Sequence, residues 1–163
     1  ISGAVSIDNL LFENNSGNGQ ISSIEKGIYN STFINNKITA KSTNDYGIIS
    51  VSDANFVSSN NVFENNTVKG FSISRGCANF TSINDTFINN RAAGDGGAVY
   101  AYISSSSFVP VATFENVKFI NNSGANGGAA TVSGATFNNV TFKDNTANTM
   151  GGAIYLFIFC NKW

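Results

Sequence analysis

"FINN" occurs three times in this chain, at Phe33–Asn36, Phe87–Asn90 and Phe119–Asn122. Three variants follow the same order, FENN at Phe12–Asn15 and at Phe63–Asn66, and FKDN at Phe142–Asn145. The six phenylalanines are separated by 21, 30, 24, 32 and 23 residues. A phrase that recurs at such intervals indicates a repeat architecture, in which each unit stacks on its neighbours.

Two further anchors define the repeat around this phrase. A large apolar residue precedes the phenylalanine by five positions in four copies and by seven in the other two: Ile7, Ile28, Phe56, Phe80, Phe114 and Phe137. Glycine pairs followed by alanine come after three copies, at Gly96–Gly97, Gly127–Gly128 and Gly151–Gly152, and weaker versions begin at Gly19, Gly47 and Gly70. Each repeat therefore reads as three short strands separated by Gly, Asn, Asp and Ser turns.

The spacing decides how these strands pair. Three strands per 21 to 32 residues do not fit tight hairpins, but they fit a coil that stacks on the previous coil at the strand spacing of about 4.8 Å. We predict an all-β fold, a single-stranded right-handed parallel β-helix (solenoid) of about six coils with three short strands each. Residues 1–163 form one repeat segment, which we expect to be a fragment of a longer protein because both ends fall inside a coil.

Stacked coils place equivalent residues above one another, which gives the phrase a structural meaning. We predict two internal aromatic stacks, one of Phe12, Phe33, Phe63, Phe87, Phe119 and Phe142, the other of Phe56, Phe80, Phe114 and Phe137. The asparagine pairs are predicted at a corner, where Asn tolerates positive φ and its amide bonds the amide one coil away. The glycine pairs are predicted at the opposite corner, where φ is positive or coils approach closely.

Composition limits the function classes. Charged residues make up 12%, the net charge is −1, and 26 asparagines supply much of the polar surface. Without a basic excess, nucleic acid is not an expected partner. Histidine is absent, and Cys77 and Cys160 lack a C-x-x-C spacing, so no cofactor is predicted. The longest apolar run, Ile154–Cys160, falls far short of the ~20 residues that span a bilayer, so this segment is not expected to insert into a membrane.

The G-G-A-[ILV] and F-x-x-N pattern resembles a known family. Gly97–Val99, Gly152–Ile154 and the six F-x-x-N matches are similar to the repeats of chlamydial polymorphic outer membrane proteins and of adhesin-like surface proteins of methanogenic archaea. The resemblance covers essentially the whole chain and implies an autotransporter-like, extracellular β-helix at the cell surface (outer membrane or cell wall), acting in adhesion. It carries over no catalytic residues. The partner it implies is a host or neighbouring-cell surface protein or a glycan.

Parallel β-helices also include polysaccharide lyases and hydrolases, which need paired carboxylates or an acidic calcium cluster with a base. Glu13 and Glu64 share a repeat position, but Ile34 lies between them, so they stand about 10 Å apart. The best constellation places Arg75 and Arg91 beside Asp85 or Asp95, and solvated charges explain it more simply. We therefore predict no catalytic, cofactor-binding or metal site.

Binding residues are less constrained by the sequence. Tyr46, Tyr100, Tyr102 and Tyr155 lie in or near the glycine-led strands, and we favour a core position for them over an outward stacking surface. The insertions Lys37–Asp45 and Ser104–Val111 are where a binding surface is expected, because loops vary without unwinding the stack. The predicted function is a non-catalytic segment of a surface-displayed adhesin, with a polysaccharide-active enzyme fragment and a purely structural stalk as alternatives.

Overall fold

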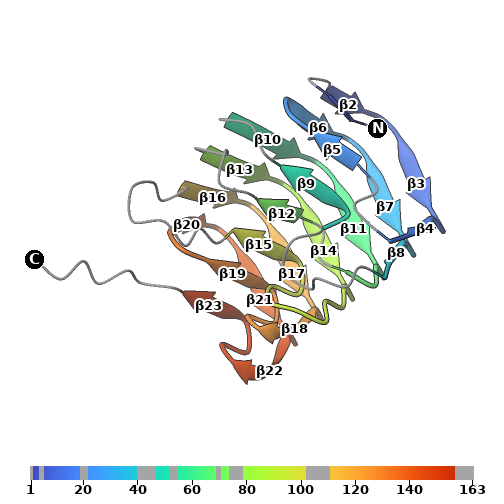
Figure 1. The fold of residues 1–163 in the computed structure, drawn as a ribbon. Coiled ribbons are helices and arrows are strands. Elements are labelled where there is room, and N and C mark those ends of the chain that lie inside the picture. The colour runs from blue at the N-terminus through green and yellow to red at the C-terminus, as the bar shows by residue number, and fades with distance from the viewer. Residues whose placement is uncertain are drawn as a thin grey trace, which may run out of the picture.

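The computed structural model describes residues 2–3, 6–18, 22–39, 47–51, 55–68, 71–73, 79–101 and 111–156. All regular structure in these ranges is β-strand, arranged as a stack of coils in which chain position advances steadily along the stack (Figure 1). Three long sheets run along the stack, and we call them sheets A, B and C.

Each complete coil contributes one strand to each sheet, and sheet A has one strand more than the other two. Sheet A contains β1 (Ser2–Gly3), β5 (Ser22–Ile24), β9 (Ile49–Val51), β12 (Phe71–Ile73), β15 (Val99–Ala101), β19 (Ala130–Val132) and β23 (Ile154–Leu156). Sheet B contains β2 (Ser6–Asp8), β6 (Gly27–Tyr29), β10 (Asn55–Ser59), β13 (Asn79–Ile83), β16 (Val111–Glu115) and β20 (Ala135–Asn138). Sheet C contains β3 (Leu11–Glu13), β7 (Thr32–Ile34), β11 (Val62–Glu64), β14 (Thr86–Ile88), β17 (Lys118–Ile120) and β21 (Thr141–Lys143).

All these strands pair in parallel with the equivalent strand of the next coil. Two small ribbons follow sheet C, one pairing β4 (Ser16–Gly17) with β8 (Lys37–Ile38), the other β18 (Ser123–Asn126) with β22 (Thr146–Met150). The chain thus passes from sheet A to B to C and returns to A one coil further on. This confirms the predicted parallel β-helix, while its right-handed sense stays a prediction.

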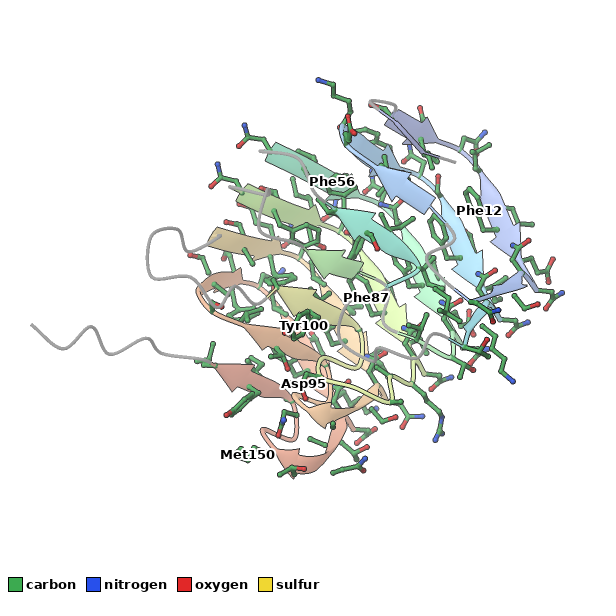
Figure 2. All side chains as sticks on the ribbon, in the orientation of Figure 1. Phe12, Phe56, Phe87, Asp95, Tyr100 and Met150 are labelled. Carbon is green, nitrogen blue, oxygen red and sulfur yellow. The ribbon has the colours of Figure 1, made fainter. Side chains whose placement is uncertain are left out.

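The first predicted aromatic stack is continuous. Phe12, Phe33, Phe63, Phe87, Phe119 and Phe142 occupy one register position in sheet C. Successive ring centroids lie 4.7 to 5.1 Å apart, and the planes are within 12° of parallel. Phe12 and Phe87, labelled in Figure 2, mark one end and the middle of this row. Each buried ring removes apolar surface from water, worth roughly 2 to 3 kcal/mol, and stacking adds about 1 kcal/mol.

The prediction of the second stack is wrong in one respect. Its four phenylalanines form two pairs that are offset along the strand, not one continuous row. Phe56 pairs in register with Phe80, and Phe114 with Phe137, but Phe80 lies opposite Ala112. The rings of Phe80 and Phe114 are tilted by 59° at 5.9 Å. The two extra residues before Phe63 and Phe87 shift the aromatic by one inward-facing position along the strand.

Phe71 fills the space that this offset leaves, and the repeat pattern did not predict it. Ser58 and Ser82 occupy the positions that Phe114 and Phe137 hold in later coils. The fully buried Phe71 ring enters from sheet A and meets four rings edge-on, those of Phe56, Phe63, Phe80 and Phe87, at centroid distances of 4.8 to 6.0 Å. Close packing is thereby kept although the sequence position of the aromatic changes.

The corner that follows sheet C, here called the second corner, carries the predicted asparagine ladder. Its inner members are Asn15, Asn36, Asn66, Asn90, Asn122 and Asn145. Asn66 shows the pattern: its Oδ1 accepts from the backbone N–H and the Nδ2 of Asn36, and its Nδ2 donates to Asn90 Oδ1 and to the Phe33 carbonyl. An amide side chain offers two acceptor and two donor positions, and Asn66 uses all four in hydrogen bonds.

The glycine pairs form a third corner, the glycine corner, as predicted. Gly96, Gly127 and Gly151 have φ of 69°, 64° and 66°, which L side chains rarely adopt. A Cβ at the following Gly97 would lie 2.0 Å from the Gly128 carbonyl oxygen of the next coil. The pair therefore combines a left-handed turn with a close approach of coils.

Candidate binding face

The outward side of sheet C is a flat face formed by alternation. The phenylalanine of each strand points inward, so the residues on either side of it point outward in two rows. One row contains Leu11, Thr32, Val62, Thr86, Lys118 and Thr141, and the other contains Glu13, Ile34, Glu64, Ile88, Ile120 and Lys143. All of these side chains are exposed or half-buried. We call this surface the outer face of sheet C.

Residues of positive φ border the face on both sides. Among the described residues, twelve residues other than glycine have positive φ, two for each strand of sheet C, with φ of 49° to 57°. The set is Asn9, Asn30, Asn60, Asn84, Asn116 and Asn139 before the strands, and Asn14, Asn35, Asn65, Asn89, Asn121 and Asp144 after them. The turn between sheets B and C, here called the first corner, is therefore also an asparagine corner.

Several of these outer amides bond to one another along the stack. In the first corner Asn84 Nδ2 donates to Asn60 Oδ1 at 3.1 Å, and Asn139 donates to Asn116 at 2.7 Å. In the second corner Asn121 donates to Asn89 at 2.7 Å, and Asn89 donates to Asn65 at 3.0 Å. One bond of this kind leaves each amide with further donor or acceptor positions that face solvent.

Two shallow polar hollows lie at these borders. The first, of about 410 Å³, is lined by Asn84, Thr86, Asn116, Lys118, Asn139 and Thr141. The second, of about 330 Å³, is lined by Asn65, Asn66, Thr67, Asn89, Arg91 and Asn121. Each combines amides and hydroxyls with a single cation. The outer face of sheet C is thus flanked by hydrogen-bonding groups.

The charges considered for catalysis do not form a site. Asp85 lies in the first corner with no exposed surface, and Arg91 follows the second corner, at the other end of β14. Asp95 lies near the glycine corner (Figure 2) and accepts bonds from the backbone N–H and Nδ2 of Asn126. Arg75 lies outside the described residues. The explanation of these charges as solvated is therefore wrong for Asp85.

Asp85 belongs instead to an inner ladder of the first corner. Its Oδ1 accepts from the Asn61 backbone N–H at 2.8 Å and from Asn61 Nδ2 at 3.1 Å, and its Oδ2 accepts from the Ser82 hydroxyl at 2.6 Å. Burial raises the pKa of Asp85 to about 6, although hydrogen bonds from Ser58, Ser82 and Asn61 oppose the rise. This carboxyl is a structural group that faces no solvent.

The other expected binding residues divide between the described and the undescribed parts of the chain. Val99 and Ala101 are buried, whereas Tyr100 between them is half-buried and so lies on the outward side of sheet A. Tyr155 shares its register position, with Thr131 between the two, and it is also half-buried, so the favoured core position is wrong for both. Tyr46, Tyr102 and most of both insertions lie outside the described residues, while Lys37 and Ile38 form β8.

Two features of this surface were not predicted from the sequence. The phrase N-x-x-F stands at Asn9, Asn30, Asn60, Asn84, Asn116 and Asn139, as regular as F-x-x-N, and it would have predicted the first corner. The outer face itself has no repeated residue type, so only strand alternation could have indicated it. Among the described residues, no group of three or more Cys, Asp or Glu could hold a metal ion, and no helix could cross a membrane.

Comparison with known protein families gives a match to a repeat model. The model of the Chlamydia polymorphic membrane protein repeat matches the chain at residues 86–102 and 139–156. Both segments start at or just before a strand of sheet C and cross the second corner and the glycine corner into sheet A. No curated protein and no solved structure matches the chain. The two matches confirm the resemblance inferred from F-x-x-N and G-G-A: at these two places the chain carries repeats of the Chlamydia polymorphic membrane protein type.

Proposed function

We propose that this chain is a non-catalytic section of an extracellular, surface-displayed adhesin that mediates attachment through the outer face of sheet C. The observation that carries the proposal is the combination of a regular sheet face with solvent-facing amides along both borders. The inner Asn ladder and the Phe row hold the backbone below this face, so little backbone order has to be gained on binding. The partner is a protein or a glycan of a host or neighbouring cell.

The choice of this face over sheet B can be tested with a matched pair of substitutions. Ile88 ends β14 of sheet C and Ile83 ends β13 of sheet B, and both are half-buried in the same coil. We expect Ile88→Glu to weaken saturable binding of the labelled chain to cells at least tenfold, because it places a charge in the middle of the contact. Ile83→Glu should leave binding within about twofold of the original chain, and thermal unfolding should show that both variants fold.

The same preparation distinguishes the alternatives. A polysaccharide-active enzyme would release reducing or unsaturated ends from pectic or other acidic polysaccharides, which a colorimetric assay detects. A structural stalk would show no saturable binding to any cell or glycan. Either result would overturn the proposal, and so would equal loss of binding in the Ile88 and Ile83 variants.

A further inference from the structure

Charge on the outer face of sheet C is divided along the stack. Among the described residues, the half formed by β14, β17 and β21 carries three exposed cations, Arg91, Lys118 and Lys143, against the exposed Asp144 and the half-buried Glu115, which precedes the first corner. Asp85 lies beneath this half and is fully buried, so it cannot contact a ligand.

The half formed by β3, β7 and β11 has the opposite balance. Among the described residues it carries the carboxylates Asp8, Glu13 and Glu64 against one cation, Lys37. An anionic partner therefore fits the first half and is repelled by the second.

The three cations are spread over the half-face and do not occupy one register position. Arg91 lies beyond the second corner, in register with Ser123, whereas Lys118 begins β17 next to the first corner, so the two border opposite edges of the face. Lys143 lies in the second outward row, one coil beyond Lys118. A ligand that contacts all three must be an extended chain with several negative charges.

Neutral groups between the cations indicate which kind of polymer this ligand is. Asn84, Asn116 and Asn139 border the half-face, and Thr86 and Thr141 add hydroxyls to the same hollow. These groups suit a partner rich in hydroxyls, because they donate and accept hydrogen bonds in equal measure. Ile88 and Ile120 offer half-buried apolar surface on which the faces of sugar rings can lie.

Other polyanions fit less well. The outward rows of sheet C contain no aromatic side chain on which a nucleic acid base could stack. The hollows are shallow and polar, unlike the desolvated pockets that hold the anchor residues of a protein partner. We propose that the half of the face formed by β14, β17 and β21 binds an acidic polysaccharide. The inference rests on the proposed attachment function and names its partner class.

Binding of defined polymers to the full chain tests this. The probes are polygalacturonate, which carries carboxylates, heparin, which also carries sulfates, and neutral dextran, with double-stranded DNA as a general polyanion. We expect surface plasmon resonance to show binding of at least one acidic polysaccharide that weakens as salt rises, and none of dextran. Binding of polygalacturonate would identify carboxylates as sufficient for recognition, and binding of heparin alone would identify sulfates as required.

Two double variants of equal charge change locate the site. Lys118→Gln/Lys143→Gln should weaken polysaccharide binding tenfold or more, since both cations lie in the half-face. Lys26→Gln/Lys37→Gln removes the same charge elsewhere and should change binding by less than about twofold. All four lysines are exposed, so thermal unfolding should be unchanged in both variants.

Several outcomes would overturn the inference: binding of neither acidic polymer, equal loss in both double variants, or DNA bound as tightly as the polysaccharide. The attachment function is measured separately on cells. If Lys118→Gln/Lys143→Gln attaches to cells like the original chain, attachment stands and the polysaccharide inference fails. If the polysaccharide binds but no cell does, the inference stands and the attachment function fails.

Discussion

Both corners that bound sheet C begin with a residue of positive φ, yet only the second corner continues with asparagine in every coil. In the first corner the inner position is Leu10, Ser31, Asn61, Asp85, Val117 and Val140 in successive coils. Asn61 accepts from the Ser31 backbone N–H and donates onward to Asp85, so the same ladder starts here too. It stops at Asp85, because the next inner residue, Val117, has no acceptor.

The difference shows that the ladder has a direction. Each inner asparagine accepts from the coil before it and donates to the coil after it. A carboxylate only accepts, so it fits at the last position of such a chain and nowhere earlier. Asp85 occupies that last position: two donors of Asn61 and the Ser82 hydroxyl converge on it, and nothing beyond it requires a donor.

The largest expected effect comes from placing a carboxylate in the middle of the complete ladder. In Asn90→Asp, the donors to Asn122 Oδ1 and to the Phe63 carbonyl are lost and a buried negative charge faces two oxygens. We expect the free energy of unfolding in urea at pH 7 to fall by about 3 to 5 kcal/mol.

Asn89→Asp is the matched control one residue earlier. Asn89 faces outward with φ of 55°, a conformation that Asp144 adopts at the equivalent position, and it donates one bond to Asn65. Its loss should be about 1 kcal/mol or less. Equal losses in the two variants would contradict the directional ladder.

How much the sequence could predict follows from the same contrast. The Phe row, the second corner and the glycine corner each use one residue type in coil after coil, so repetition alone indicated their structure. The first corner was missed because the varied inner residues obscured the asparagine before them. Phe71 was missed because its row in sheet A otherwise holds smaller side chains such as Ile49 and Val99, so only packing against four rings explains it.

The outer face of sheet C could not be predicted from repetition, because solvent-facing positions are free to differ between coils. Threonine, isoleucine, lysine and glutamate alternate there without a motif. The sequence indicates which residues face inward, and the outward rows are known only once the register between coils is fixed.

The second prediction removes the charge at the end of the short ladder. Because burial raises the folded-state pKa of Asp85 from 3.8 to about 6, ionisation disfavours the folded state. The Asp85 contribution to stability is therefore lost as pH rises from about 4 through about 6. Asp85→Asn should raise the free energy of unfolding at pH 7 by roughly 3 kcal/mol and by little at pH 4.

The geometry for an amide at this position already exists one coil earlier, where Asn61 Nδ2 donates to the Ser58 hydroxyl. Urea unfolding of both proteins between pH 4 and pH 8 checks the prediction. If Asp85→Asn lowers stability at pH 7, or if its advantage does not grow with pH, the carboxyl is better satisfied when ionised than its burial implies.

The smallest effect tests whether the ladder can be extended. Val117→Asn alone should destabilise the chain, because the new Oδ1 would face the Asp85 carboxylate across the coil spacing. Combined with Asp85→Asn, the same Oδ1 would accept from the amide Nδ2 introduced at position 85 and from the backbone N–H there, as Asn122 does from Asn90. A double-mutant cycle at pH 8 should give a favourable coupling of roughly 1 kcal/mol.

Val140→Asn, two coils beyond Asp85, is the control and should add to Asp85→Asn within about 0.3 kcal/mol. If the Val117 pair is equally additive, asparagines of adjacent coils stabilise the stack independently, and the two corners differ in composition alone.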